Sequence, residues 1–559
     1  MSQPVVQPLE TETSSILTSN IPLILIGIIS VLLGYQYWFK NQRYVQMGNK
    51  FPGPATLPFI GNAHLAFGKS AHGLFELAMA YYKELQIDVG RIWLGPRLII
   101  GVANADDIEI ILGNSVHLEK SPDYGLFEPW LGDGLLISKG EKWRSHRKMI
   151  APTFHTSILK SFMPVFNRNA TALVETFRKE QGKVFDCHDY LSSTTVDTLL
   201  ETAMGVTKEH DSKAGFDYAM AVMRMCNILH LRHMKFWLRP DTIFNFTKLS
   251  NIQVNLLKVI HDLTNGTIKR KKANYFEREK SGEKSLYEQA VKTSKFDEKQ
   301  GNLIETRDLM SNLLRDDLDE NEENDVGEKK RLAFLDYLIE ASQTKGNALS
   351  DKEINEEVNT IMFEGHDTTA AASSFVISLL GIHQDVQERA FNELKEIFSD
   401  NLHRPVTFND TLHMKYLERV ILESLRMYPP VPMIARKVNE DVKLASGDYT
   451  IPAGTTVIVS QYILHRNEKY YKNPTVFDPD NFLPEKCQER PYYAFIPFSA
   501  GPRSCVGRKY AMLKLKVLLA DVIRKFHIES VDKETDFRLQ GDIILKREEG
   551  FRVKVTERA

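Results

Sequence analysis

A single cysteine, Cys505, stands in a loop-forming segment, Phe498–Gly507, that precedes a long helical pattern. A cysteine thiolate can ligate haem iron and donate the electron density that favours oxygen cleavage, provided that the backbone shields it from water. Gly501 would let the backbone approach closely because it has no Cβ, Arg503 is placed to meet an anionic propionate, and Phe498 can pack beside the sulfur. The alternative is an inert, buried cysteine. The agreement of these residue types favours a haem-thiolate site with Cys505 as the iron ligand.

This segment resembles the haem-binding signature of the cytochrome P-450 superfamily, whose Phe, two Gly, Arg and Cys are all matched. The resemblance extends from about residue 51 to the C-terminus. It implies a mainly α fold with a small β portion, the cytochrome P-450 fold, and haem with a cysteine thiolate on its iron. It also implies a monooxygenase that uses molecular oxygen and receives electrons from NADPH through a separate reductase.

Residues 351–380 have the pattern of a long, mostly apolar helix that contains Glu364, Gly365, Asp367 and Thr368. Gly365 and Thr368 can loosen the helical ladder and leave room for oxygen and water. Asp367 and Thr368 match the superfamily's acid and alcohol pair, which the resemblance implies relays protons. Glu364, one turn before Thr368, is expected at the haem edge. The string resembles family four of the superfamily, in which the equivalent Glu can form an ester with a haem methyl group.

Trp143 and Arg147 lie four residues apart, hence on one face of a predicted helix. The pair resembles the superfamily's WxxxR motif, which implies a clamp on a haem propionate. Taken alone, the same spacing is typical of a cation–π pair at a protein surface. Arg436, which follows a Pro-Pro turn, is predicted to be a further propionate partner.

Glu423 and Arg426 match the superfamily's ExxR pair. On a surface such an ion pair would contribute little, but beside the haem loop it should lock the proximal side. The superfamily usually adds an arginine from an FxPxRF segment. Here Asn481 stands at that position, so a neutral hydrogen-bonding group is expected in place of the charge.

Length and composition predict one large catalytic unit with appendages, since the chain has 559 residues and no internal repeat. A net charge of −2 argues against a nucleic-acid partner. The four cysteines lack CxxC spacing, which argues against zinc or a disulfide framework. No GxGxxG or P-loop pattern appears, so electrons must come from another protein. A reductase, with cytochrome b5 as a second candidate, is expected to dock on a basic proximal set: Lys142, Arg144, Lys148, Arg508, Lys509, Lys514 and Lys516.

The N-terminal region predicts a membrane anchor. Residues 21–39 carry no charge and end in aromatic residues, which suits a bilayer span. A cleaved signal peptide is the alternative, but the preceding residues carry no basic side chain and no small-residue cleavage site follows. Basic residues after the span place residues 1–20 in the lumen of the endoplasmic reticulum and the rest in the cytosol. A proline-rich hinge is predicted at 40–62, followed by the haem-thiolate domain at 63–559.

Two further segments stand out by composition. Residues 269–330 are polar, with eight acidic residues between Asp316 and Glu328, and predict a mobile surface insertion. The other segment predicts a flexible substrate roof or a contact with lipid, although an ordinary helical core explains it as well. That segment contains Met220, Met223, Met225, Phe236 and Trp237.

Within family four, several strings resemble the insect G subfamily: residues 331–336, 362–369, 477–484 and 510–514, together with the acidic insertion. The resemblance implies oxidative decarbonylation of long-chain fatty aldehydes to hydrocarbons one carbon shorter, for the cuticle. Fatty-acid ω-hydroxylation and oxidation of xenobiotics or hormones would use the same iron chemistry. A haem-thiolate sensor or isomerase is a more distant alternative, against which Asp367 and Thr368 argue.

Overall fold

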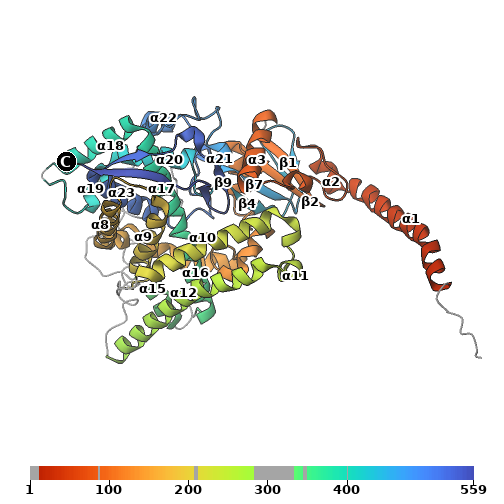
Figure 1. Ribbon diagram of the computed structural model, residues 1–559, viewed down its shortest axis with the longest axis horizontal. Helices are drawn as coiled ribbons and strands as arrows, with labels where there is room; N and C mark the ends of the chain where they lie inside the picture. The colour runs from red at the N-terminus through yellow and green to blue at the C-terminus, as the bar shows by residue number, and fades with distance from the viewer. Residues whose placement is uncertain are drawn as a thin grey trace, which may run out of the picture.

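Helices make up most of the structure, and short strands form a smaller part, of which one group lies beside the N-terminal helices (Figure 1). The computed structural model describes residues 12–85, 88–206, 212–281, 333–343, 349–399 and 401–558. The mainly α architecture with a small β portion confirms the fold class predicted from the sequence.

The longer helices of the body are α3 (Ala71–Leu85), α4 (Ala105–Leu112), α6 (Gly140–Ile150), α8 (Met163–Lys179), α9 (Cys187–Thr202), α10 (Ser212–Met234), α12 (Lys248–Lys280), α15 (Phe334–Gln343), α16 (Asp351–Glu364), α17 (Asp367–Ile382), α18 (Gln384–Ile397), α20 (Lys415–Met427) and α23 (Arg508–Lys525). The shorter ones are α2 (Arg43–Gly48), α5 (Glu128–Leu131), α7 (Thr156–Ser161), α11 (Asp241–Phe244), α19 (Phe408–His413), α21 (Gln461–Leu464) and α22 (Pro484–Gln488).

Helix α17 forms the centre of the larger core. Every residue from Thr369 to Gly381 is buried, as expected for a helix that is apolar on all sides. It packs against α9, α10, α20 and α23. The approach is close, because a Cβ on Gly381 would lie 2.6 Å from the backbone nitrogen of Ser530. This packing fixes the N-terminal turn of α17, where Asp367 and Thr368 lie.

Strands form two main sheets. The first has the order β1 (Val89–Leu94), β2 (Arg97–Val102), β7 (Thr456–Val459), β4 (Ile434–Lys437), with β2 and β7 parallel and the other pairs antiparallel. The second is antiparallel, with the order β3 (Val184–Asp186), β11 (Arg552–Glu557), β8 (Phe526–Ser530). Two strand pairs complete the set: β5 (Val442–Lys443) with β6 (Thr450–Ile451), and β9 (Leu539–Gly541) with β10 (Leu545–Arg547). The first two strands, β1 and β2, form a hairpin.

Helix α1 (Glu12–Lys40) leads away from the body (Figure 1). Its segment Pro22–Lys40 is long and apolar enough to cross a membrane, and none of it is buried inside the body. Only its last turns contact the body, where the Phe39 ring meets the Trp93 ring edge-on at 5.8 Å. The predicted hinge at 40–62 differs from the structure. It contains α2, and its proline segment is packed against β1: Phe51 is buried, and the Pro52 carbonyl accepts a hydrogen bond from Arg91 at 2.8 Å. These contacts make it an integral edge of the fold.

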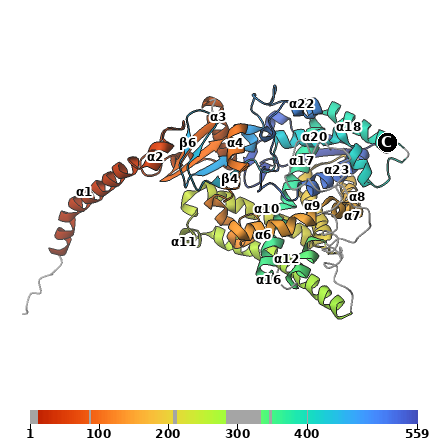
Figure 2. The ribbon, with the colours of Figure 1, turned by 180° about the vertical axis from the view of Figure 1, so that it is seen from behind.

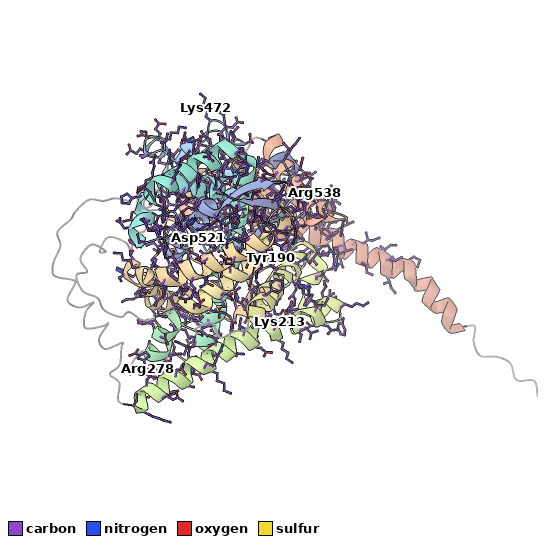
Figure 3. All side chains as sticks on the ribbon, turned by 60° about the vertical axis from the view of Figure 1, so that its left-hand side comes forward. Tyr190, Lys213, Arg278, Lys472, Asp521 and Arg538 are labelled. Atoms are coloured by element: carbon purple, nitrogen blue, oxygen red, sulfur yellow. The ribbon has the colours of Figure 1, made fainter. Side chains whose placement is uncertain are left out.

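The start of the polar segment predicted at 269–330 is also corrected. Helix α12 continues to Lys280, and Arg278 lies near its far end, beyond the body (Figure 3). The prediction failed at this boundary because α12 has charged residues on most sides in its last turns, so the apolar periodicity fades before the helix ends. The acidic stretch 316–328 lies outside the described residues.

Candidate active site

The loop that carries Cys505 is held by its own backbone. The amide of Cys505 donates to the Phe498 carbonyl at 2.9 Å, and the amide of Ser504 donates to the Gly501 carbonyl at 2.9 Å. Gly501 has a φ of 69°, and a Cβ there would lie 1.9 Å from the Leu112 carbonyl oxygen. Glycine is required at this position because any Cβ would clash with the end of α4, and because the positive φ disfavours other residues. The loop ends at Gly507, directly before α23.

Cys505 lies three residues before the start of α23. Its side chain is exposed, but enough protein surrounds the sulfur for burial to raise the pKa of its thiol to about 11. The charge of Glu364 contributes to this raised pKa, whereas Arg147 and Arg508 oppose it. The predicted ligand and the predicted haem-edge carboxyl are therefore within electrostatic range of each other.

Arg503 joins this loop to helix α6. Its guanidinium donates to the carbonyls of Leu135 and Ser138, at 3.3 and 2.5 Å, and stands 4.2 Å from the centre of the Trp143 ring. The cation–π contact of Trp143 is thus made with Arg503 across the fold, while the sequence spacing had suggested Arg147. Burial, followed by the charges of the nearby Arg436 and Arg147, lowers the pKa of Arg503 to about 9.

Buried cations gather where the propionates were predicted. Arg436 on β4, Arg147 on α6 and Arg503 are all buried. Lys120 joins them, because its backbone pairs with Arg436 and its ammonium stands 4.9 Å from the Tyr124 ring. Burial, followed by the charges of Arg436 and Arg503, holds the pKa of Lys120 well below its usual range.

This group of cations fits a buried dianion. Within the described residues, Nη2 of Arg436 and Nε of Arg503 are buried and have no hydrogen-bond partner, and buried cations are stable only when they are paired. Two carboxylates of a bound porphyrin would supply the missing charge. The residues present therefore fit haem: Arg503, Arg436, Arg147, Lys120 and Tyr124 would surround its carboxylates, and Cys505 would bind its iron.

The predicted single helix 351–380 is broken at the site. Helix α16 ends at Glu364, and α17 begins at Asp367, with Gly365 and His366 between them. The hydroxyl of Thr368 donates to the carbonyl of Glu364 at 2.7 Å. Burial raises the pKa of the Glu364 carboxyl to about 7, although Lys120 opposes the shift. The loosened ladder that Gly365 and Thr368 predict is thus present as an interruption between two helices.

Asp367 and Thr368 point to different partners. The Asp367 carboxylate is fully buried and pairs with Lys546 of β10 at 3.2 Å, and the Cys226 thiol lies 3.9 Å from it. Burial alone would raise the pKa of Asp367, but Lys546, His366 and His188 lower it below its usual value. The Asp367 carboxylate is therefore held ionised beside Lys546, while the Thr368 hydroxyl is bonded to the Glu364 carbonyl.

The ExxR pair is a buried, bidentate ion pair. Arg426 donates to both oxygens of Glu423 at 2.7 Å, and neither side chain is exposed. Asn481 donates to Glu423 at 3.1 Å, so the neutral group takes the place of the expected third charge. Arg426 also donates to the His465 carbonyl at 2.9 Å, and the His465 ring accepts from the amide of Ile496 at 2.9 Å. This chain of contacts reaches the start of the cysteine loop.

The proposed basic docking set needs a correction. Arg508, Lys514 and Lys516 are buried. Lys514 donates to the Thr195 carbonyl at 3.2 Å, and Lys516 pairs with Glu418 at 3.1 Å. They lie on the core face of α23, which the charge count alone did not reveal. Arg144 and Lys148 remain exposed on α6.

Sequence reasoning missed Lys120, Tyr124 and Lys546. No motif marks them, and each meets its partner only through the fold: Lys120 reaches Arg436 by an isolated bridge between distant segments, and Lys546 lies 179 residues from Asp367. A signal that could have singled out Lys120 is its place directly before Ser121-Pro122, which forces a turn.

Comparison with known proteins places this geometry in a family. The family model described as "Cytochrome P450" matches residues 51–555. Cytochrome P450 4g15 of Drosophila melanogaster is 50% identical over 95% of this chain and 96% of its own length. Cytochrome P450 4g1 of the same organism is 50% identical over 96% of this chain and 94% of its own length. Cytochrome P450 4V2 of Mus musculus is 35% identical over 96% of this chain and 94% of its own length.

Proposed function

The chain belongs to the cytochrome P450 family, hence to the haem-thiolate monooxygenases, and on that premise we propose that it converts long-chain fatty aldehydes to hydrocarbons one carbon shorter. The observation that carries the proposal is the 50% identity to two 4g relatives over nearly the whole chain, combined with the subfamily strings at 362–369 and 477–484. Their names state no substrate, so the aldehyde rests on the resemblance to the insect G subfamily.

The proposed reaction consumes molecular oxygen and electrons from an external donor. An aldehyde RCHO, one O2, two electrons and two protons give the hydrocarbon RH, CO2 and H2O. The electrons come from NADPH through a separate reductase, with cytochrome b5 as a second candidate. Fatty-acid ω-hydroxylation is the second candidate function, because it would use the same iron chemistry and the same family motifs.

In this proposal, the chain's own residues hold the cofactor and deliver protons. Bound haem supplies the oxygen chemistry. Cys505 ligates the iron, while Arg503, Arg436, Arg147 and Trp143 hold the propionates, with Phe498 beside the sulfur and Gly501 setting the loop. Thr368 and Asp367 serve proton transfer. Glu423, Arg426 and Asn481 keep the loop in place.

Thr368→Ala tests the proton role. We expect haem content to be unchanged, because the hydroxyl contacts only a helix carbonyl in the described structure. Product formed per NADPH consumed should fall roughly tenfold, since general acid–base help is worth about 10² or more when fully lost and water can partly substitute. The measurement compares NADPH consumption with product by gas chromatography.

Thr369→Ala is the matched control for this test. Its hydroxyl bonds the carbonyl of Gly365 at 3.4 Å and is buried on the neighbouring side of α17. The control should keep the wild-type ratio of product to NADPH. A Thr368 variant with that same ratio, or a Thr369 variant with an equal loss, would contradict the role of Thr368.

Glu364 is proposed to form an ester with a haem methyl group. Burial favours its neutral form, with a pKa of about 7, and its position beside the break between α16 and α17 brings it within electrostatic range of Cys505. Acidified organic extraction of the holoenzyme should leave part of the haem on the protein, and Glu364→Ala should release all of it. Complete extraction from the native protein would contradict the ester.

The proposed location is the endoplasmic reticulum membrane, with the catalytic domain in the cytosol. Helix α1 provides the anchor. A second apolar surface supports the same orientation: Phe67 stacks on Trp237 at 5.8 Å and meets Phe236 at 6.2 Å, and all three are exposed. Aromatic groups of this kind favour a membrane interface. Arg144 and Lys148 would contribute to the docking of an acidic reductase.

A further inference from the structure

A carboxylate in the middle of α16 has contacts that the proposed reaction does not use. Glu357 is 1% exposed. One of its oxygens meets Nδ1 of His146 on α6 at 2.7 Å, and the other accepts the backbone amide of Leu135 at 3.1 Å. Removing a buried charge costs much when its partners stay behind. Glu357 therefore fixes two segments relative to α16.

Both segments lead directly to the cation group. The carbonyls of Leu135 and Ser138 accept the guanidinium of Arg503. His146 is the chain neighbour of Arg147, one turn after Trp143, whose ring packs on Arg503. Each oxygen of Glu357 is thus connected to the candidate propionate site through one residue: through Leu135 to Arg503, and through His146 to Arg147. Figure 2 labels α6 near α12 and α16 in the lower part of the body.

The loop before Leu135 has little freedom to take another position. A Cβ on Gly134 would lie 2.2 Å from the Thr360 hydroxyl oxygen, and one on Gly132 would lie 2.8 Å from a carboxylate oxygen of Glu356. Gly132 also has a φ of 57°. The loop therefore packs closely against α16. This contact fixes the backbone around Leu135, so that its amide stays within hydrogen-bonding distance of Glu357.

We propose that Glu357 and His146 form a positioning pair that sets the placement of Arg503 and Arg147 around the haem carboxylates. The pair touches neither substrate nor cofactor and acts through the 132–139 loop and through α6. The inference rests on the proposed haem contacts of Arg503 and Arg147, and it is independent of which substrate is oxidised.

The protonation state of His146 affects the strength of its contact with Glu357. Burial lowers the pKa of His146, but its bond to Glu357 and the nearby Glu353 raise it above its ordinary value, against the opposing charge of Lys142. Lys142 itself pairs with Glu356 and Asp133. A histidine with a raised pKa contributes its stabilisation fully below its ordinary pKa and loses it as pH rises through the raised value. The pair should therefore weaken on the alkaline side.

The test uses holoenzyme, with two readouts that need no substrate: the rate at which the thiolate band of the reduced CO complex is lost, and the midpoint potential of the haem. Glu357→Leu should lose the band about tenfold faster, because it strands two buried donors. Its potential should also become more negative, since the guanidinium groups no longer neutralise the carboxylates as well. The wild-type rate should rise as pH passes through the raised pKa of His146.

Two conservative variants separate positioning from bulk packing. In Glu357→Gln the amide can accept from Leu135 and donate to a neutral His146, and in His146→Gln the amide donates to Glu357 at any pH. In both variants the rate at which the band is lost should stay within about threefold of the wild-type rate at neutral pH. This rate should not change when the pH is raised. His146→Gln is the more decisive of the two variants, because it keeps the carboxylate of Glu357, which also raises the pKa of Glu364. Should Glu357→Leu yield no holoenzyme, these variants carry the test.

Glu356→Gln is the matched control, since Glu356 also joins α16 to α6, through Lys142 at 2.8 Å, but touches neither Leu135 nor His146. It should leave both readouts unchanged. The proposal is overturned if Glu356→Gln acts as strongly as Glu357→Leu, if the potential of Glu357→Leu equals that of the wild type, or if His146→Gln keeps the wild-type pH profile.

Discussion

Cys505→Ala is expected to abolish the absorption band of the reduced CO complex that gives the family its name, and all monooxygenase activity with it. The physical reason is the loss of the thiolate that supplies electron density to the iron. The cation group around Arg436 and Arg503 does not involve Cys505, so some haem should still associate with the variant. The measurement is the CO-difference spectrum together with total haem by extraction.

Cys487→Ala is the control, because Cys487 is half-buried on α22 and contacts only Arg490 among the described polar groups. It should keep the full thiolate band. Persistence of that band in Cys505→Ala, or its loss in Cys487→Ala, would remove Cys505 from the role of iron ligand.

Glu423→Leu is expected to be the most damaging substitution for stability. It removes the only described carboxylate bonded to the fully buried Arg426, which keeps hydrogen bonds to the carbonyls of His465, Pro474 and Val476 alone. An uncompensated buried charge costs about 3 to 5 kcal/mol, a large share of the roughly 5 to 15 kcal/mol of a typical domain. Folded, haem-containing protein should therefore hardly accumulate. Yield, haem content and thermal unfolding measure the effect.

Glu423→Gln gives the graded comparison. It keeps an acceptor for Arg426 and for the amide of Asp478, which donates to Glu423 at 2.9 Å, so its loss should be clearly smaller than that of the leucine variant. Equal stability of Glu423→Leu and wild type would show that the cysteine loop is held by other contacts.

The cysteine loop and the ExxR pair could be predicted because their residues are close in the chain. Cys505 and Gly501 share one loop, and Glu423 and Arg426 share one helical turn, so spacing alone brings them together. The placement of Asn481 against Glu423 followed from a motif that the chain matches at its other positions.

Contacts between distant segments could not be predicted in this way. The stacking of Arg503 on Trp143 joins residues on α6 and on the cysteine loop, and the pairing of Asp367 with Lys546 joins α17 to β10. Neither carries a local pattern. Burial of Lys514 and Lys516 was missed for a related reason, since a lysine on a helix is exposed in most proteins. Only the packing of α23 shows that these two face the core.

Incubation of the holoenzyme with a long-chain fatty aldehyde labelled with ¹³C at its carbonyl, together with NADPH, oxygen and a reductase, tests the central claim most directly. Gas chromatography with mass spectrometry should find an unlabelled hydrocarbon one carbon shorter and labelled CO2, with none formed by Cys505→Ala. A product that keeps the label and carries a new hydroxyl group at the far end of the chain would contradict decarbonylation and identify an ω-hydroxylase.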